Sequence, residues 1–445
     1  MKGDLTTGSP ARKLFAFTAP TLVGVLFQQL YNIVDSIIIG QFVSLDALAA
    51  VSASYPVTAL FIGMATGGSA GATILVSFHF GSKQMDEMMT SVRTCLISFG
   101  SFALTLMLGG LLLDRSVLTA LQTPAEIFVP ARQYLDIFLL GLPFLFLYNA
   151  VNASFQAVGN SRTPLVLLIF SSGLNVVLDL WWVAGLGWGV IGAAAATLLS
   201  QALACVTALC LLQCQLRPWQ GLGQRFRSRT LRSLIHYAVP GMLQQSVVAI
   251  GQLFMQSRIN SFGTAVVAGH AAAFKINTIV LAVMNAQSSA LSAFTSQNLG
   301  AGKKDRITRG FRAALGAALA LCGAISACAF FFSGSFVGIF LEKPVNREAL
   351  DTGIRFLHIV SPFYLLLGVK MCADGLLKGL GDMKTFTIST IADLCVRVGT
   401  AFLFSSSIGY TAVCLGYPFG WVVGITLTCM GLFRARRHPP VTAST

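Results

Sequence analysis

Apolar stretches of about 20 residues recur along almost the whole chain, separated by short loops that carry charges, glycine or proline. About 20 apolar residues are what one helix needs to cross the hydrocarbon core of a bilayer. Of the 445 residues, 55% are hydrophobic and only 10% are charged. Backbone groups in lipid must be satisfied within a helix or in a closed barrel, and these stretches are too long and too uniformly apolar for barrel strands. The sequence therefore predicts an all-α integral membrane protein.

Twelve transmembrane helices are expected from the apolar windows. Five prolines inside or beside these windows should bend the helices, because proline removes a backbone hydrogen bond. They are Pro20, Pro56, Pro143, Pro240 and Pro362. The expected spans are 14–40, 47–77, 93–113, 133–154, 163–183, 189–214, 233–257, 265–297, 310–332, 353–377, 386–406 and 411–433.

The two halves of the chain resemble each other. A shift of about 220 residues places Pro20 on Pro240 and Met64 on Met284, and with slight slippage Gly159-Asn160 falls on Gly381-Asp382. Each half has six helices, so both halves enter the membrane from the same side, as in a parallel pseudo-two-fold repeat. We predict two six-helix bundles, at residues 1–214 and 233–445, joined by a basic linker at 215–232.

The net charge of +14 is distributed unevenly. If both ends are cytoplasmic, most Lys and Arg residues fall in inner loops, and the positive-inside rule then fixes this orientation. The charge is thus interpreted as a topology signal with anionic lipid as partner, and not as a nucleic-acid surface. We expect a plasma-membrane location and a monomer. The basic residues of the outer loops are Arg115, Arg132, Arg258, Lys343, Arg347 and Arg355.

Enzyme and cofactor motifs are absent from the sequence. There is no phosphate-binding loop and no nucleophile elbow. The ten cysteines are scattered through apolar windows, and the three that are close together do not have a common metal-binding spacing. We therefore predict no catalytic residue, no cofactor and no metal other than a transported Na⁺.

Ionisable residues inside the predicted spans are distributed differently in the two halves. Burying such a residue in the bilayer costs free energy, so each one is expected to have a partner or a function. The first half has Asp35 and Asp179, without Lys or Arg in its spans. In the second half Lys370 and Asp374, and likewise Asp393 and Arg397, are four residues apart on one helix face, so both are predicted to be structural ion pairs.

The carboxylates of the first half predict a cation site. Counting 1.5 Å per residue from the helix ends places Asp35, Asp179 and Thr197 at comparable depth. Asn175 lies one turn from Asp179 on the same face. Such oxygens can hold a shared proton or Na⁺. Alternatively, Asp35 caps a kink and Asp179 lies wet at the interface beside Trp181, which would make Asp179 the less sensitive of the two.

Several segments, taken in order, resemble the multidrug and toxic compound extrusion (MATE) family. They are Pro20, Tyr31-Asn32-Ile33-Val34-Asp35, Asn175-Val176-Val177-Leu178-Asp179, and residues 189–197, which read GVIGAAAAT. The likeness covers essentially the whole chain. It implies a V-shaped pair of bundles that exports organic cations or other amphipathic compounds against H⁺ or Na⁺ by alternating access.

The resemblance also implies site residues. It assigns the N-terminal cation site to Asp35, Asn175, Asp179 and Thr197, with Asn152 and Tyr31 nearby, although Asn152 lies deeper by the count of helix rise. The seventh helix departs from NorM-like members, because it offers Gln252 and Gln256 and no acid. This departure favours the DinF-like branch, which couples through the first half alone.

Three questions stay open at the level of sequence. Lys275 could line the substrate cavity and disfavour purely cationic drugs, or it could pair with Asp374. A flippase for a lipid-linked saccharide or peptidoglycan precursor shares the architecture, but it would be expected to carry several basic residues in its cavity. A channel or a structural scaffold does not explain why buried carboxylates without basic partners occur in one half only.

Overall fold

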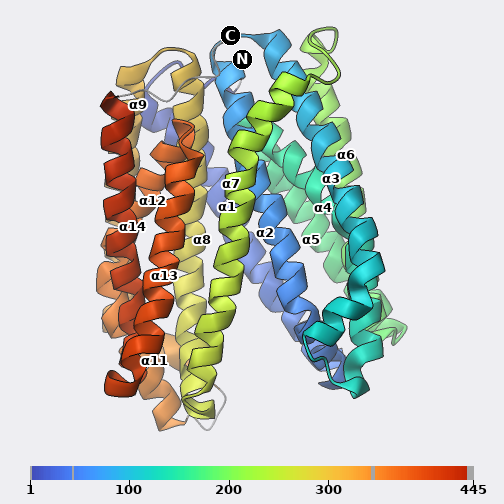
Figure 1. The fold of residues 1–445 in the computed structure, drawn as a ribbon, viewed down its shortest axis with the longest axis vertical. Coiled ribbons are helices and arrows are strands. Elements are labelled where there is room, and N and C mark those ends of the chain that lie inside the picture. Colours follow the sequence, from blue (N-terminus) through green and yellow to red (C-terminus); the bar gives the residue numbers. More distant parts are fainter. Residues whose placement is uncertain (1–2, 43–44, 342–345, 438–445) are drawn as a thin grey trace. The chain divides into compact units, whose positions relative to one another are not determined.

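The computed structural model describes residues 3–42, 45–341 and 346–437, and it describes the side chains of these residues except at 32–33, 35–48 and 435–437. The described part of the first half is built of α-helices joined by short connections (Figure 1). Its helices are α1 (Pro10–Phe42), α2 (Leu45–Gly81), α3 (Met85–Ala120), α4 (Ala125–Ala157), α5 (Arg162–Asp179) and α6 (Gly189–Leu216).

The second half has the same kind of structure, with one helix broken into two and one short additional helix, α10. A 3-10 turn at Ser361–Phe363, which contains Pro362, separates α11 from α12 within one apolar span. Proline has no backbone N–H to continue the helix, so the predicted bend at this position is a full interruption. The helices are α7 (Ser228–Asn260), α8 (Thr264–Gly300), α9 (Lys304–Phe331), α10 (Ser333–Ile339), α11 (Arg347–Val360), α12 (Tyr364–Gly379), α13 (Met383–Ile408) and α14 (Thr411–Arg437).

Eleven spans in the described part of the chain are long and apolar enough to cross a membrane by composition alone, with α11 and α12 counted as one. The remaining long helix, α7, has 33 residues but is less apolar, since it begins in a basic stretch and carries Gln252 and Gln256. With α7 the chain has twelve transmembrane helices. The predicted all-α fold of two six-helix halves is confirmed.

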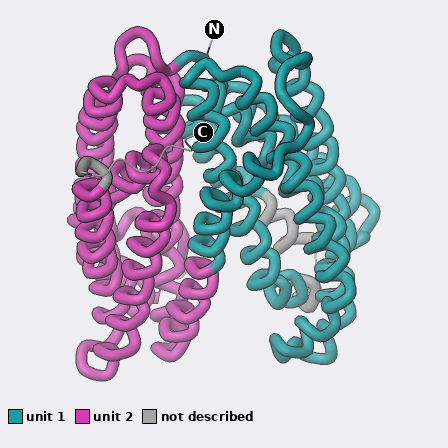
Figure 2. The backbone as a smooth tube through the Cα atoms, turned by 45° about the horizontal axis from the view of Figure 1, so that its top comes forward, with its two compact units in different colours: residues 1–4, 19–246 teal, residues 5–18, 247–445 magenta. Residues whose placement is uncertain are grey.

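The chain divides into two compact units, which Figure 2 colours teal and magenta. Unit 1 comprises residues 1–4 and 19–246, and unit 2 comprises residues 5–18 and 247–445. Two helices change unit along their length: α1 passes from unit 2 to unit 1 after Thr18, and α7 passes from unit 1 to unit 2 after Ser246. The boundaries predicted at 214 and 232 stay a prediction.

The core of unit 1 is built on close helix contacts at small residues. A methyl group at Gly67 would lie 2.2 Å from the Gly241 carbonyl oxygen, and one at Gly71 would lie 2.5 Å from the Ala238 nitrogen. These two glycines are one turn apart, so the backbone of α2 directly contacts that of α7. Large buried side chains such as Phe146 and Phe155 of α4 fill the adjacent core.

The segment between the halves is fixed to unit 1 by α3. The Arg93 guanidinium donates to the backbone oxygens of Leu222 at 2.9 Å and Gly223 at 3.2 Å. Asp86 Oδ1 accepts from the Gly223 N–H at 3.2 Å, and Arg227 forms an ion pair with Glu87. The predicted linker is therefore an ordered segment held by charge-assisted hydrogen bonds.

The N-terminal segment has an equivalent attachment in unit 2. Arg306 of α9 donates to the backbone oxygens of Leu5 at 3.0 Å and Thr7 at 3.2 Å, and Lys303 donates to Thr6 O at 2.9 Å. The Leu5 N–H donates to buried Gln297 Oε1 at 3.1 Å. Each unit thus binds, through basic side chains, the segment that precedes one of the two crossing helices.

Candidate functional site

Asn175 is the centre of the polar cluster in unit 1. Its side chain, on α5, contacts the Tyr31 hydroxyl on α1. In the amide orientation that satisfies all its neighbours, Asn175 also donates to Asp179 Oδ2 at 3.1 Å and accepts from the Thr197 N–H of α6 at 3.2 Å. The structure therefore brings together four of the six residues predicted for the cation site, from three helices.

Asp179 is the last residue of α5, and a π-helical turn at Leu180–Gly185 follows it directly. Its side chain is buried, since the residue is only 1% exposed. The alternative of a wet carboxylate beside Trp181 is thus wrong, although Trp181 itself is exposed. The chain then turns through Gly187 and Gly189, which have φ of +68° and +55° and suit the left-handed region. Single π-helical turns are found frequently at functional sites.

The other two residues predicted for the cation site are Asp35, whose side chain is not described, and Asn152, which lies on α4. Asp35 belongs to α1, one turn beyond Tyr31, but its side chain lies outside the described residues. Asn152 lies on α4, and its Oδ1 is buried without a hydrogen-bond donor among the described residues. The described contacts of Asn175 do not include Asn152, and the greater depth expected for Asn152 stays a prediction.

A cavity of about 490 Å³ adjoins this cluster and lies wholly within unit 1. Its walls come from α1, α2, α4, α5 and α6, and Tyr31, Asn152, Asn175 and Thr197 all line it. A cavity of this size can hold a drug-sized molecule. Sequence reasoning placed the substrate cavity elsewhere, near Lys275, Gln252 and Gln256, and it did not find this cavity.

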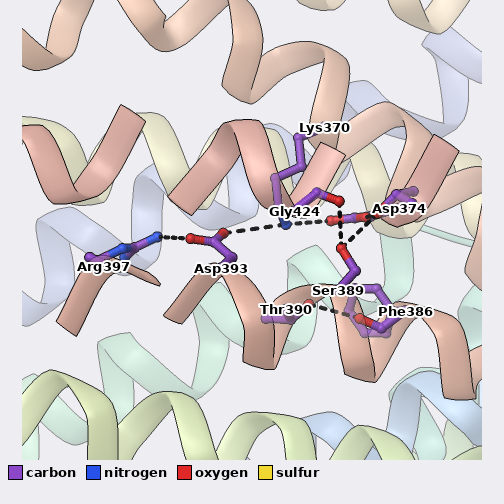
Figure 3. Close-up of polar contacts among 9 residues, drawn as sticks. Lys370, Asp374, Phe386, Ser389, Thr390, Asp393, Arg397 and Gly424 are labelled. Carbon is purple, nitrogen blue, oxygen red and sulfur yellow. Dashed lines mark hydrogen bonds and ion pairs between the residues drawn. The ribbon is translucent and has the colours of Figure 1, made fainter. Parts of the chain in front are cut away.

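In unit 2, Lys370, Asp374, Asp393 and Arg397 form one continuous row, which we call the charge row (Figure 3). Lys370 Nζ lies 2.8 Å from Asp374 Oδ2 and 3.6 Å from Asp393 Oδ2, and Arg397 Nη2 lies 3.0 Å from Asp393 Oδ1. Thr428 of α14 donates to Asp374 Oδ1 at 2.7 Å. Both predicted pairs are present, but Lys370 joins them into a balanced network of two acids and two bases across α12 and α13.

The charge row packs against glycines of α14. A methyl group at Gly420 would lie 2.2 Å from Asp393 Oδ1 and 2.7 Å from the Asp393 backbone oxygen, and one at Gly424 would lie 2.5 Å from Lys370 Cε. These positions are four residues apart on one helix face. The absence of side chains there lets α14 approach the buried charges.

We expect Gly420→Ala to destabilise the protein by about 1–3 kcal/mol, the usual cost of overpacking a filled core. The added methyl group must displace the Asp393 carboxylate or its backbone. Gly399→Ala on α13 is the matched control, because a methyl group at that position would meet no described atom within 4 Å. Thermal unfolding in detergent should show a lower midpoint for Gly420→Ala only, and equal midpoints would contradict this packing.

Lys275 and the two glutamines of α7 are separate from both clusters. The exposed Lys275 ammonium lies 5.1 Å from the centre of the Phe340 ring, and among the described residues no ion pair joins it to Asp374. Gln256 donates to Asn260 Oδ1 at 2.8 Å on its own helix, and Gln252 is exposed. A role of these three side chains in substrate binding stays a prediction.

One acidic cluster of the first half was not predicted. Arg132 Nε of α4 lies 2.6 Å from buried Asp114 of α3 and 3.9 Å from Asp136. The sequence analysis named only Asp35 and Asp179 in this half, whereas α4 also carries Asp136. The four-residue spacing of Arg132 and Asp136 was a usable signal.

Comparison with known protein families finds two matching segments, one in each half of the chain. The sequence pattern of the family described as MatE matches residues 20–181 and, separately, residues 240–403. The chain belongs to the MatE family. Both matched segments begin at the prolines that the repeat superimposes, so this result confirms the resemblance found in the sequence. Assignment to the DinF-like branch stays a prediction.

Relatives of this MatE-family chain extend over nearly its full length. The probable multidrug resistance protein YpnP of Bacillus subtilis is 25% identical over 415 residues, covering 93% of this chain and 92% of that protein. The FAD transporter of Shewanella oneidensis is 25% identical over 374 residues, covering 82% of this chain and 79% of that protein. A solved outward-facing structure of a multidrug resistance MATE family transporter has a TM-score of 0.91 at 23% identity, with 98% of both chains covered. That likeness supports the fold of twelve transmembrane helices described above.

Proposed function

We propose that the protein is a secondary active multidrug efflux transporter that exchanges organic cations or other amphipathic compounds for H⁺ or Na⁺ by alternating access. Family membership and the multidrug resistance relatives support the transport class. The single observation that supports the coupling site is the convergence of Tyr31, Asn175, Thr197 and the buried Asp179 in one cluster of unit 1. Asp35, one turn from Tyr31, is the second carboxylate of this proposed site.

The residues present fit either driving ion. A buried carboxylate is costly to keep charged, so it takes up a proton or a cation readily. For Na⁺, oxygens of Asp179, Asn175 and Thr197 are hard ligands of the kind that such cations prefer. Neutralising Asp179 weakens its charge-assisted hydrogen bond from Asn175, and that bond joins α5 to the Tyr31 and Thr197 contacts of α1 and α6. Ion binding can therefore bias how these three helices pack.

The remaining proposals concern the oligomeric state, location, orientation and partners of the protein. It acts as a monomer in the plasma membrane, with both termini and the 215–232 linker in the cytoplasm, surrounded by lipid and without nucleic acid or an organic cofactor. The charge asymmetry of the loops supports this orientation. The charge row is proposed to be structural, because its two acids are already balanced by Lys370 and Arg397.

Orientation can be tested at Gly221, an exposed linker position where an added methyl group would meet no described atom within 4 Å. In a background without native cysteines, Gly221→Cys should react with a membrane-impermeant maleimide only after cells are permeabilised. Glu126→Cys, in the loop predicted to lie outside, is the control and should react in intact cells. Strong labelling of Gly221→Cys in intact cells would reverse the proposed topology.

The proposed function is tested most simply in proteoliposomes. A pH gradient and a Na⁺ gradient are imposed separately, and efflux of a loaded fluorescent substrate is measured for each. Transport against the substrate gradient under at least one of them is the expected result. Substrate movement that only follows its own gradient would indicate a channel and would contradict the proposal.

A further inference from the structure

Arg258, in the last turn of α7, is held by aromatic rings and hydroxyl groups of unit 2. The carbon at the centre of its guanidinium lies 5.3 Å from the centre of the Phe262 ring and 5.8 Å from that of the Phe402 ring on α13. Both distances are typical of cation–π interactions. Its Nε donates to Ser405 Oγ at 2.7 Å, its Nη2 donates to the same oxygen, and its Nη1 donates to Ser261 Oγ at 3.3 Å. These side chains together fix the position of the guanidinium.

The groups that hold Arg258 are themselves held in place. Ser261 Oγ donates its own proton to the Arg258 backbone oxygen at 2.7 Å, and Ser405 Oγ donates to a backbone oxygen of its own helix at 3.5 Å. Each hydroxyl oxygen therefore presents its lone pairs to the guanidinium. The Phe262 ring packs edge-on against the ring of the buried Tyr410. The guanidinium is thus pre-organised for a ligand, which lowers the entropic cost of binding one.

The contacts of Arg258 leave both donors and charge available. An arginine has five N–H donors, and the hydrogen bonds to the two serines use three of them. Hydroxyl groups and aromatic rings do not neutralise the positive charge. The described ion pairs of unit 2 are those of the charge row, and they do not include Arg258. The remaining donors and the charge fit an anion with several oxygens, such as a phosphate group.

The surroundings of Arg258 indicate which molecule carries that phosphate. Arg258 and Ser405 lie near the last residues of two membrane-crossing helices, at the end that the proposed orientation places outside. Lipid headgroups lie at this depth, with the acyl chains directly beneath them. Phe254, one turn before Arg258 on α7, is exposed, and so are Leu403 and Phe404 on α13. An apolar surface below a fixed guanidinium matches the two parts of a phospholipid.

We propose that the guanidinium of Arg258 binds the phosphate group of a phospholipid in the outer leaflet. The N–H groups that the serines leave unused donate to phosphate oxygens, and the exposed apolar side chains of α7 and α13 contact the acyl chains. The site lies in unit 2, apart from the coupling cluster of unit 1, and goes beyond the proposed transport function. Loss of efflux in the gradient assay would therefore leave the lipid site standing.

The test titrates a soluble lipid, dioctanoylphosphatidylglycerol, into the purified full-length protein in detergent. Native mass spectrometry measures the dissociation constant of the first lipid bound. Arg258→Gln should weaken binding by about tenfold, because a charge-assisted hydrogen bond is lost. Arg355→Gln, which removes an exposed base of α11, is the matched control and should change the constant by less than about twofold. Equal weakening by both variants would reduce the effect to general charge attraction and would overturn the site.

Two further probes separate a lipid phosphate from other ligands. Dioctanoylglycerol has the same acyl chains without phosphate, so it should bind about tenfold more weakly and should not respond to Arg258→Gln. Inorganic phosphate, titrated by calorimetry, lacks the acyl chains and should also bind at least about tenfold more weakly than the lipid. Binding of inorganic phosphate as tight as that of the lipid and dependent on Arg258 would show a site for free anions and would overturn the lipid assignment.

Other variants keep the test valid if Arg258→Gln does not fold. Ser405→Ala keeps the guanidinium but removes the acceptor of two of its N–H groups, so it should weaken lipid binding by about threefold. An unchanged constant would contradict the pre-organised site. Glu342→Gln removes an acid whose side chain lies outside the described residues, and it should leave the constant unchanged. A tenfold gain in lipid affinity in this variant would show that Arg258 is paired with that acid and would overturn the proposal.

Discussion

Asp179→Asn is expected to lower gradient-driven efflux by about tenfold or more, since coupling between two sites is typically worth about 1–3 kcal/mol. The amide mimics the neutral carboxyl group at nearly constant volume, so the α5 cluster should stay in the state that ion binding favours. Because Asp179 is buried and contacts Asn175, its loss should be as damaging as that of Asp35. Efflux from proteoliposomes under separate pH and Na⁺ gradients measures the effect.

Glu126→Gln is the matched control for this substitution. Glu126 is an exposed carboxylate in the first turn of α4, in the same unit, and its neutralisation should leave efflux unchanged. The yield and unfolding temperature of Asp179→Asn should stay near those of the unsubstituted protein. Efflux by Asp179→Asn at the wild-type rate would exclude this carboxylate from coupling.

Lys370→Met is expected to destabilise the protein by about 3–5 kcal/mol, the usual cost of leaving buried charges without their partner. Lys370 is 1% exposed and is the only described base that contacts both acids of the charge row. Its removal leaves Thr428 as the described hydrogen-bond partner of Asp374, with the buried Lys378 one turn further along α12, and it leaves Asp393 paired with Arg397. Thermal unfolding in detergent should show a lower midpoint for Lys370→Met than for the unsubstituted protein.

The double variant Lys370→Met with Asp374→Leu tests whether the row acts as balanced pairs. It removes one acid and one base together and leaves the 3.0 Å pair of Arg397 and Asp393 in place. It should therefore be more stable than Lys370→Met alone. If single and double variants unfold at the same temperature, the pairing of these charges does not determine stability.

The parts of the site that could be predicted are those that follow from the regular geometry of a single helix. Asn175 and Asp179 share a face because they are four residues apart, and the count of helix rise brought Thr197 to their level. The same spacing predicted Lys370 with Asp374 and Asp393 with Arg397. It could not predict the 3.6 Å contact of Lys370 with Asp393, because that contact depends on how α12 packs against α13.

Other features depend on packing that periodicity does not encode. The walls of the cavity come from α1, α2, α4, α5 and α6, and nothing in the local spacing of their residues shows that they meet. Asp179 is buried directly before a π-helical turn that the sequence did not predict, whereas neighbouring Trp181 suggested an exposed position. Hydropathy predicted the helix count well, with α7 the least apolar of the twelve because it begins in a basic segment.

The most direct test of the coupling site is gradient-driven efflux by Asp35→Asn in proteoliposomes, measured together with substrate exchange at equal concentrations and without an ion gradient. If the driving ion binds between Asp35 and Asp179, efflux under both the pH and the Na⁺ gradient is lost, while folding and membrane insertion are kept and exchange remains measurable. Efflux by Asp35→Asn at the wild-type rate under either gradient would contradict the proposed coupling site.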